Sequence, residues 1–212
     1  MTQVKTFTFG PYQANSYVCY SGKDAVLVDA TAYFPGEHRA VEAFLREEGL
    51  VLRHLLLTHA HLDHIFGCAH FAYRFAMRWH AHPDCLPFLE NASLQATMYG
   101  MAIQEHPLPA HDLYEGNVIT FGETSWDVLH TPGHAPGSVC FYDSQAGFAL
   151  VGDVLFQGSI GRHDLPGGNL QQLMASIHQK LLTLPGETVI YPGHGPSTTV
   201  DLEKEHNPFL TS

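Results

Sequence analysis

A run of histidine and aspartate residues near position 60 constrains this chain more than any other feature. The run is Thr58-His59-Ala60-His61-Leu62-Asp63-His64. It follows the apolar triplet Leu55-Leu56-Leu57, which is typical of the end of a buried strand, and a segment with helical periodicity comes next, so the run is predicted to lie on a strand-to-helix turn. His59 and His61 are two residues apart on an extended chain and can face one metal ion from the same side. Asp63 and His64 lie where the chain turns and are expected to point elsewhere, which indicates a second ion nearby.

Three more residues that could bind a metal each follow a strand-like run and stand in a glycine-containing turn. They are His134 in Thr131-Pro132-Gly133-His134, Asp153 in Val151-Gly152-Asp153, and His194 in Tyr191-Pro192-Gly193-His194-Gly195-Pro196. The chain has 16 histidines, and a single histidine is usually an ordinary core or surface residue. Seven candidate ligands at predicted strand ends instead form the pattern of a metal centre.

The set His-x-His-x-Asp-His, Gly-His, Gly-Asp and Gly-His-Gly-Pro resembles that of the metallo-β-lactamase superfamily over nearly the whole chain. The resemblance implies an α/β fold, a four-layer αββα sandwich of two mixed β-sheets with helices on the outer faces and metals at one edge. The implied ligands are His59, His61 and His134 for a first metal, Asp63, His64 and His194 for a second, and Asp153 as the bridge. Asp29 would orient a ligand histidine, although a strand-end aspartate that caps a turn is an equally good interpretation of the residue itself.

Two further motifs resemble the short type II glyoxalase-like hydrolases of bacteria. They are Gly161-Arg162-His163-Asp164-Leu165-Pro166-Gly167-Gly168 and Glu205-His206-Asn207-Pro208-Phe209-Leu210. This resemblance implies hydrolysis of S-acyl thiols such as S-D-lactoylglutathione. The C-terminal helical domain with which full-length glyoxalase II enzymes bind glutathione is expected to be missing. Arg162 is then the candidate cation for a substrate carboxylate, and a structural pair with Asp164 is the alternative.

The donor set predicts a catalytic metal centre. Structural zinc sites are closed, usually by cysteines, whereas mixed histidine and carboxylate ligands leave coordination positions open. Two divalent cations, with Zn²⁺ as the default and Fe²⁺ or Mn²⁺ as alternatives, would lower the pKa of a shared water, and the resulting hydroxide would attack an ester or thioester carbonyl. Asp63 is the candidate catalytic residue, because it is a ligand that can also hold the proton of this water. Thr58, which precedes His59, is a candidate for orienting a ligand or contacting substrate.

Two other functions fit the same residues. A mononuclear iron dioxygenase acting on persulfides would use His59, His134 and Asp153 as a face of two histidines and one carboxylate. A non-enzymatic binding module on the same fold is the other alternative, but degenerate members of such families lose ligands, and all seven are present here.

Length, charge and apolar runs restrict the domain organisation, the kinds of partner and the cellular location that are expected for this chain. The 212 residues suit one domain of two similar halves, about 1–112 and 113–212, and 10 basic against 21 acidic residues give a net charge of -11, which disfavours nucleic acid. The N-terminus lacks the apolar core of a signal peptide, and no apolar run has the length of a membrane span, so a cytoplasmic protein with a small-molecule substrate is expected.

The four cysteines are expected to be buried free thiols. The oligomeric state is left open.

Periodicity predicts the elements that carry these motifs. Strands are expected at 4–9, 16–20, 25–28, 52–57, 78–81, 118–121, 126–129, 139–142, 148–151 and 188–191, and helices at 37–48, 65–77, from 83, at 170–182 and near 202–206. Residues 91–111 lack sheet signals and are expected to form an insertion or lid over the site. A second His-x-His pair, His80 and His82, is interpreted as structural and not as metal-binding, because no turn that carries a carboxylate lies nearby in the sequence.

Overall fold

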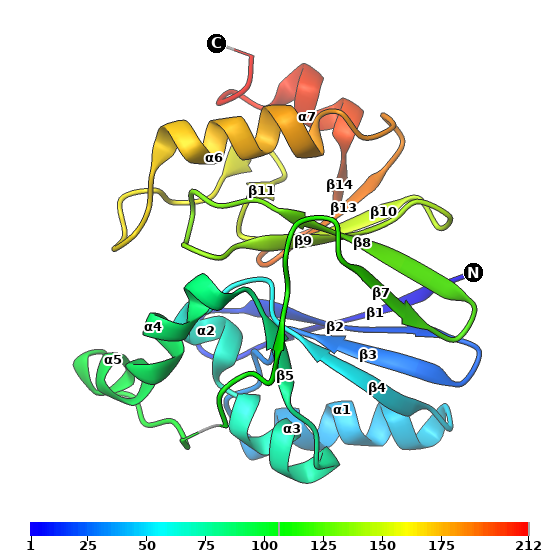
Figure 1. The fold of residues 1–212 in the computed structure, drawn as a ribbon, viewed down its shortest axis with the longest axis vertical. Coiled ribbons are helices and arrows are strands. Elements are labelled where there is room, and N and C mark those ends of the chain that lie inside the picture. Colours follow the sequence, from blue (N-terminus) through cyan, green and yellow to red (C-terminus); the bar gives the residue numbers. More distant parts are fainter. Residues whose placement is uncertain (106, 212) are drawn as a thin grey trace.

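Two six-stranded sheets, packed face to face, form the centre of the molecule in a computed structural model that describes residues 1–105 and 107–211 (Figure 1). The first sheet has the order β1-β2-β3-β4-β5-β6, with β1 Gln3–Phe9, β2 Ala14–Ser21, β3 Asp24–Val28, β4 Val51–Leu56, β5 Trp79–Ala81 and β6 His111–Asp112. Strands β1, β2 and β3 pair antiparallel, and β3 through β6 pair parallel.

The second sheet is built from the later part of the chain. Its order is β14-β13-β10-β9-β8-β7, with β7 Val118–Phe121, β8 Thr124–His130, β9 Val139–Asp143, β10 Phe148–Gly152, β13 Val189–Pro192 and β14 Thr198–Thr199. Strands β10 and β13 are parallel, and the other neighbours are antiparallel. A separate two-stranded hairpin, β11 Leu155–Phe156 and β12 Ser159–Ile160, follows β10.

Helices cover the outer faces of both sheets and complete four layers (Figure 1). Helices α1 Pro35–Glu47 and α3 Cys68–Phe75 lie outside the first sheet, and α6 Leu170–Ser176 and α7 Val200–His206 lie outside the second. The shorter helical segments are α2 Leu62–Ile65, the 3-10 turn η1 Pro83–Cys85, α4 Leu86–Glu90, α5 Ala92–Met98 and the π-helical segment η2 Ile177–Leu181. The predicted four-layer α/β sandwich is confirmed. Within the described ranges, no helix combines the length and the apolar character needed to cross a bilayer.

Alternate residues of the central strands fill different apolar layers. In β3, Leu27 faces the layer that contains residues of α1 and α3, whereas Val28 faces the layer between the two sheets. In β10, Leu150 faces the layer between the sheets and Val151 faces the layer beneath α6. All four side chains are fully buried. Because successive strand residues point to opposite faces, the part of a strand that is covered on both faces is apolar, as at 25–28 and 148–151.

The helix predicted for residues 65–77 is confirmed as α3, but it is shorter, and a separate short helix, α2, precedes it. Helix α2 begins at Leu62, so Asp63 and His64 lie in its first turn, and the chain breaks before α3 begins at Cys68. At the break, the backbone N–H of Gly67 donates to the carbonyl of Ala30, 2.7 Å away, instead of continuing the helical ladder. This contact turns the chain against the first sheet immediately after the histidine and aspartate run.

Other differences from the sequence prediction concern short or irregular elements. The helix predicted at 170–182 ends its regular part at Ser176 and continues as η2. Strands β6, β11, β12 and β14 have two residues each and were not predicted, because two residues cannot establish a period. The predicted insertion 91–111 contains α5 at its start and the first residue of β6 at its end, while its position 106 lies outside the described residues.

The four cysteines are buried free thiols, as predicted. Burial raises the pKa of Cys19 and Cys68 well above the ordinary range and raises that of Cys85 and Cys140 to about 12. A thiol acts as a nucleophile or metal ligand in its thiolate form, so these four side chains are inert packing residues at neutral pH.

Candidate metal centre

The structure brings the candidate ligands together in two groups at one edge of the sandwich. The groups are His59, His61 and His134, and Asp63, His64 and His194, and within each group the ligand atoms lie within 4.8 Å of one another. The first four ligands in the chain follow β4, and the others follow β8 and β13. The ends of strands from both sheets therefore supply both groups.

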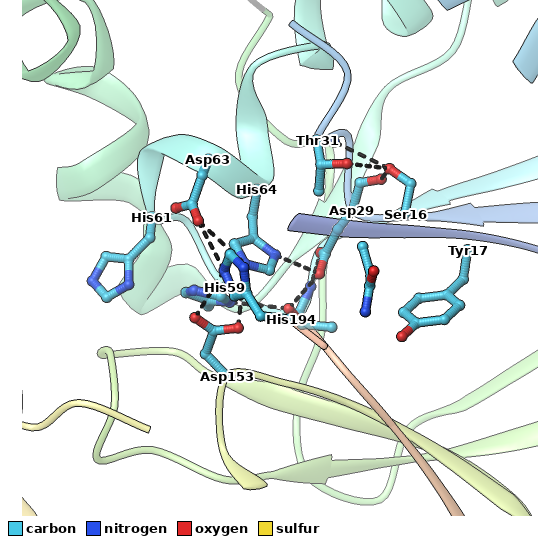
Figure 2. A network of polar contacts seen from close by, with 12 residues as sticks. Ser16, Tyr17, Asp29, Thr31, His59, His61, Asp63, His64, Asp153 and His194 are labelled. Atoms are coloured by element: carbon cyan, nitrogen blue, oxygen red, sulfur yellow. Dashed lines mark hydrogen bonds and ion pairs between the residues drawn. The ribbon is translucent and has the colours of Figure 1, made fainter. Parts of the chain in front are cut away.

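The carboxylate of Asp153, which follows β10, points toward the histidines of the centre (Figure 2). Its Oδ1 is 3.3 Å from His64 Nε2, and its Oδ2 is 3.6 Å from both His134 Nε2 and His194 Nε2. One carboxylate thus contacts both groups, which is the position that the family resemblance implies for a bridging ligand.

Three buried atoms of this centre have no hydrogen-bond partner among the described residues. They are His59 Nε2, His64 Nε2 and Asp153 Oδ1. Leaving buried polar atoms unpaired is unfavourable, and such atoms in a folded protein require an explanation. Imidazole nitrogens and a carboxylate oxygen are the donors that Zn²⁺, Fe²⁺ and Mn²⁺ accept. The residues present therefore fit a divalent cation.

Asp29 orients histidines of both groups. Its Oδ2 accepts hydrogen bonds from Thr58 Oγ1 at 2.7 Å and from His64 Nδ1 at 2.9 Å, and its Oδ1 accepts from the Thr58 backbone N–H at 2.7 Å. Thr58 Oγ1 in turn lies 3.0 Å from His59 Nδ1 and accepts a hydrogen bond from its N–H. Because the Nδ1–H groups of His59 and His64 are engaged in this way, both Nε2 atoms are left free to face the centre.

Asp29 itself adopts a left-handed backbone conformation with φ of 56°. Its backbone is held by a hydrogen bond from its N–H to the carbonyl of Leu56 at 2.9 Å and by one from Ser16 Oγ to its own carbonyl at 2.7 Å. Thr31 Oγ1 lies 2.9 Å from Ser16 Oγ and completes the network (Figure 2). A left-handed aspartate is uncommon, and these contacts maintain the conformation that points its carboxylate at the centre.

Arg162 contributes to the centre through its main chain. Its carbonyl accepts a hydrogen bond from His134 Nδ1 at 2.7 Å, so the Nε2 of His134 faces Asp153. The guanidinium of Arg162 makes two hydrogen bonds of 3.0 Å to the carboxylate of Asp164, and both side chains are exposed. The structural pair of Arg162 with Asp164, which was the alternative interpretation of Arg162 from the sequence, is therefore present.

Asn15 and Tyr17 support the turn that carries His194, and sequence analysis missed both. Asn15 Nδ2 donates to the carbonyls of Pro192 at 3.0 Å and Gly195 at 2.9 Å, and Tyr17 Oη donates to the carbonyl of Pro192 at 2.5 Å. Both residues lie on β2, in the other sheet. Asn15 stands next to another polar residue, Ser16, in β2, so its neighbouring sequence gave no signal of this role.

Gly193 makes room for the centre. A Cβ at this position would collide with Asp153 Oδ1 and with the ring of His64. The glycine in the Gly-His turn is therefore required by the close approach of backbone to the ligands.

The histidines of the first group have lowered pKa values. Burial lowers the pKa of His59 well below its usual range, and it lowers that of His61 to about 4, with neighbouring imidazoles adding to both shifts. Burial also lowers the pKa of His134. These three imidazoles are neutral at pH 7 and are ready to bind a cation.

The pKa values of the histidines in the second group are raised instead of lowered. Burial alone would lower the pKa of His64, but the carboxylates of Asp153, Asp63 and Asp29 raise it well above its usual range. Burial alone would also lower the pKa of His194, but its hydrogen bond to Asp63 and the charges of Asp153 and Asp63 together raise it. Without a cation, the protons of the centre are therefore held in the second group.

Members of both groups line the floor of a cleft of about 660 Å³: His61 and His134 of the first, Asp63 and His194 of the second, with Asp153. Apolar side chains make most of its walls: Tyr12, Leu62, Tyr99, Phe156, Ile160 and Leu165. Gln95, on α5, and Tyr99, which follows it, show that the segment predicted to cover the site forms one wall. A cleft with polar groups on its floor and apolar walls is typical of a small-molecule site.

A third group, His82, Asp84 and His130, also places possible ligand atoms within 4.8 Å of one another. The rings of His82 and His130 are stacked, with centroids 4.2 Å apart and planes only 4° from parallel. The lone pairs of an imidazole lie in the ring plane, so those of two parallel rings cannot meet at one ion about 2.1 Å away. This group is a packing contact between the two parts of the chain.

A four-layer αββα sandwich with histidine and aspartate ligands at one edge defines a class of metal-binding proteins. The chain belongs to the metallo-beta-lactamase superfamily, whose family model matches residues 9–194. Among its relatives, a Bacillus subtilis protein named "Probable metallo-hydrolase YqgX" is 41% identical, over 95% of this chain and 94% of that protein. "Hydroxyacylglutathione hydrolase GloC" of Haemophilus influenzae is 36% identical, over 90% of this chain and 89% of that protein.

Solved structures agree with this assignment. A structure described as "BLEG-1 B3 metallo-beta-lactamase" superposes with a TM-score of 0.91 at 39% identity, over 99% of this chain and 100% of that one. A structure of "TTHA1623 in a di-iron-bound form" superposes with a TM-score of 0.89 at 43% identity, over 98% of this chain and 100% of that one.

The first prediction concerns the orienting role of Asp29. We expect Asp29→Asn to weaken metal binding by about 10- to 100-fold, because Thr58 and His64 lose the carboxylate that fixes their donors. Competition with a chromophoric chelator measures the affinity. Asp164→Asn, on an exposed residue outside the centre, is the matched control and should bind like the wild type. Equal affinity of Asp29→Asn and wild type would contradict the orienting role.

The second prediction concerns pH. His64 and His194 have raised pKa values, so a cation must displace their protons, and its affinity should rise with pH through and above the usual histidine range and fall as the pH is lowered. We expect up to about two protons to be released per chain at neutral pH. Calorimetry in buffers of different ionisation enthalpy measures this release. His194→Gln should release fewer protons, and pH-independent binding without release would contradict the assignment.

Proposed function

We propose that this chain is a metal-dependent hydrolase of thioesters or esters, with S-D-lactoylglutathione or a related S-acyl thiol as substrate. The observation that carries the proposal is the position of Asp153 between two complete ligand groups on the floor of an open cleft. When bound, a pair of divalent cations lowers the pKa of water toward neutrality and polarises a carbonyl oxygen, so no serine or cysteine nucleophile is required. The burial of all four cysteines agrees with this mechanism.

In this proposal, the group of His59, His61 and His134 holds one cation, and the group of Asp63, His64 and His194 holds the other. Asp153 serves both. Mixed nitrogen and oxygen donors accept Zn²⁺, Fe²⁺ and Mn²⁺. The di-iron form of the similar solved structure supports iron beside zinc as the metal.

Asp63 is the proposed catalytic residue among the ligands. Its carboxylate lines the cleft, and its Oδ2 accepts a hydrogen bond from His194 Nε2 at 3.0 Å. Burial would raise the pKa of Asp63, but the charge of His64 and the bond from His194 lower it below the usual range, so the side chain is ionised at neutral pH. An ionised carboxylate facing the cleft can hold the proton of the attacking water.

Two similar proteins support different substrate classes. The Haemophilus influenzae relative named as a hydroxyacylglutathione hydrolase supports a thioester substrate, and the structure described as a B3 metallo-beta-lactamase makes a β-lactam amide the second candidate. A mononuclear iron dioxygenase needs only His59, His134 and Asp153. The complete group of Asp63, His64 and His194 favours hydrolysis over that alternative.

The third prediction is thioester hydrolysis. We expect protein loaded with Zn²⁺ or Fe²⁺ to release thiol from S-D-lactoylglutathione, measured with a thiol-reactive dye. Asp63→Ala and His59→Ala should each lower kcat/KM at least about 100-fold, since each removes a candidate ligand and Asp63 also holds a proton. His206→Ala, at a side chain that is 71% exposed, is the control and should be as active as the wild type.

Parallel assays decide between the functions. Metal-replete protein that cleaves neither thioesters nor esters would overturn the proposal. Opening of a β-lactam ring would then support the amide alternative, and oxygen uptake with glutathione persulfide would support the dioxygenase.

The fourth prediction concerns Arg162. Among the described residues that line the cleft, it is the one with a permanent positive charge, and we propose that it attracts a substrate carboxylate in competition with Asp164. Arg162→Gln should raise KM about threefold for S-D-lactoylglutathione and less for an uncharged thioester, a small effect because the residue is exposed. Asp164→Asn should lower KM. Equal KM values for all three proteins would contradict the role, and metal content should not change, since His134 contacts only the Arg162 backbone.

A further inference from the structure

The hairpin of β11 and β12 forms the wall of the cleft next to His194. Three of its residues, Phe156, Ser159 and Ile160, line the cleft. The ring of Phe156 lies with its centroid 6.3 Å from that of His194. The hairpin begins two residues after Asp153, so its position affects the space immediately above the candidate metal ligands.

Two buried polar residues at the end of the chain hold the tip of this hairpin. Glu203, on α7, accepts a hydrogen bond from the Gly158 backbone N–H at 2.9 Å. Asn207, which follows α7, donates through Nδ2 to the carbonyl of Ser159 at 3.0 Å. Glu203 is 2% exposed and Asn207 is 0% exposed, so water does not compete for these bonds. The helix therefore contacts the hairpin through two main-chain groups at its turn.

Further hydrogen bonds fix Glu203 and Asn207 in place. Asn207 Nδ2 also donates to Glu203 Oε2 at 2.7 Å, and Thr198 Oγ1 donates to Glu203 Oε1 at 2.6 Å. Asn207 Oδ1 accepts from the Phe209 backbone N–H at 3.0 Å. A buried carboxylate is stable when its oxygens are occupied by donors, and both oxygens of Glu203 are.

We propose that Glu203 and Asn207 are positioning residues that set the shape of the substrate-binding wall, an inference that rests on the proposed hydrolase function. Their side-chain hydrogen bonds go to the hairpin, to Thr198, to Phe209 and to each other, and none goes to a candidate metal ligand among the described residues. Loosening the hairpin tip therefore moves the wall residues Phe156 and Ser159 without removing any metal donor. Substrate binding depends on this pair, and metal binding does not.

The test compares three variants with the wild type, all as metal-loaded full-length chains. Asn207→Leu keeps the volume but removes the donor to Ser159 and Glu203. Glu203→Gln is the conservative variant, which retains an acceptor for Gly158. Glu205→Gln is the control, since Glu205 lies on the same helix with a side chain that is 70% exposed.

Three measurements separate a positioning role from a general loss of structure. Hydrogen exchange of the peptide covering 155–161 reports the hairpin directly and needs no activity. In Asn207→Leu we expect faster exchange there, unchanged metal content, and a fall in kcat/KM of about tenfold that arises mainly from KM. Glu203→Gln should show a smaller change in the same direction, and Glu205→Gln should show none.

Unchanged exchange of the hairpin in both Asn207→Leu and Glu203→Gln would overturn the proposal. A fall in kcat with unchanged KM, or a loss of bound metal, would overturn it as well. If Asn207→Leu does not fold, the same three measurements on Glu203→Gln test the proposal. If the wild type cleaves no thioester, the proposed function fails, but hydrogen exchange and metal content still test whether the pair holds the hairpin independently of the centre.

Discussion

The carboxylate of Asp29 is the contact on which the candidate metal centre depends. It is buried and accepts hydrogen bonds from Thr58 and from His64. The Thr58 hydroxyl in turn accepts a hydrogen bond from His59 Nδ1 and so orients the His59 ring. A histidine ring has two nitrogens, and the one that faces a metal is selected by what the other one binds. One buried oxygen, Asp29 Oδ2, therefore determines which nitrogen is free in two histidines that belong to different groups.

The centre also depends on the packing of one sheet against the other. The histidine and aspartate run follows the first sheet, whereas the turns of His134, Asp153 and His194 belong to the second. Main-chain hydrogen bonds join the two parts beside the ligands, from Val139 N–H to the Thr58 carbonyl at 2.8 Å and from Asn15 N–H to the Gly193 carbonyl at 2.7 Å. Ligand atoms can lie within a few ångströms of one another only because the sheets close in this register, so the apolar layer between the sheets supports the chemistry as well as the fold.

Much of the fold and the ligand groups could be predicted from the sequence, because the relevant signals are local. Apolar runs that end in Gly-His or Gly-Asp mark strand ends, and strand ends of a sandwich meet at an edge. The supporting residues carry no such signal. Asn15 and Glu203 are polar residues whose partners lie far along the chain, at Pro192 and Gly158, and nothing in their neighbouring sequence distinguishes them from exposed polar residues. The break between α2 and α3 was missed for a similar reason, since the hydrogen bond from Gly67 to Ala30 is a tertiary contact that competes with the helix.

The floor and the walls of the cleft are held by different parts of the structure. The floor is fixed by buried hydrogen bonds between strand ends, and three atoms of the centre have no hydrogen-bond partner among the described residues. The walls come from α5, from the Arg162 loop and from the β11–β12 hairpin, and α5 leaves Met98 78% exposed. Because the ligands do not lie on these wall elements, wall residues can change without altering the metal donors. In the proposed hydrolase, the walls of the cleft rather than the metal ligands therefore select the acyl compound.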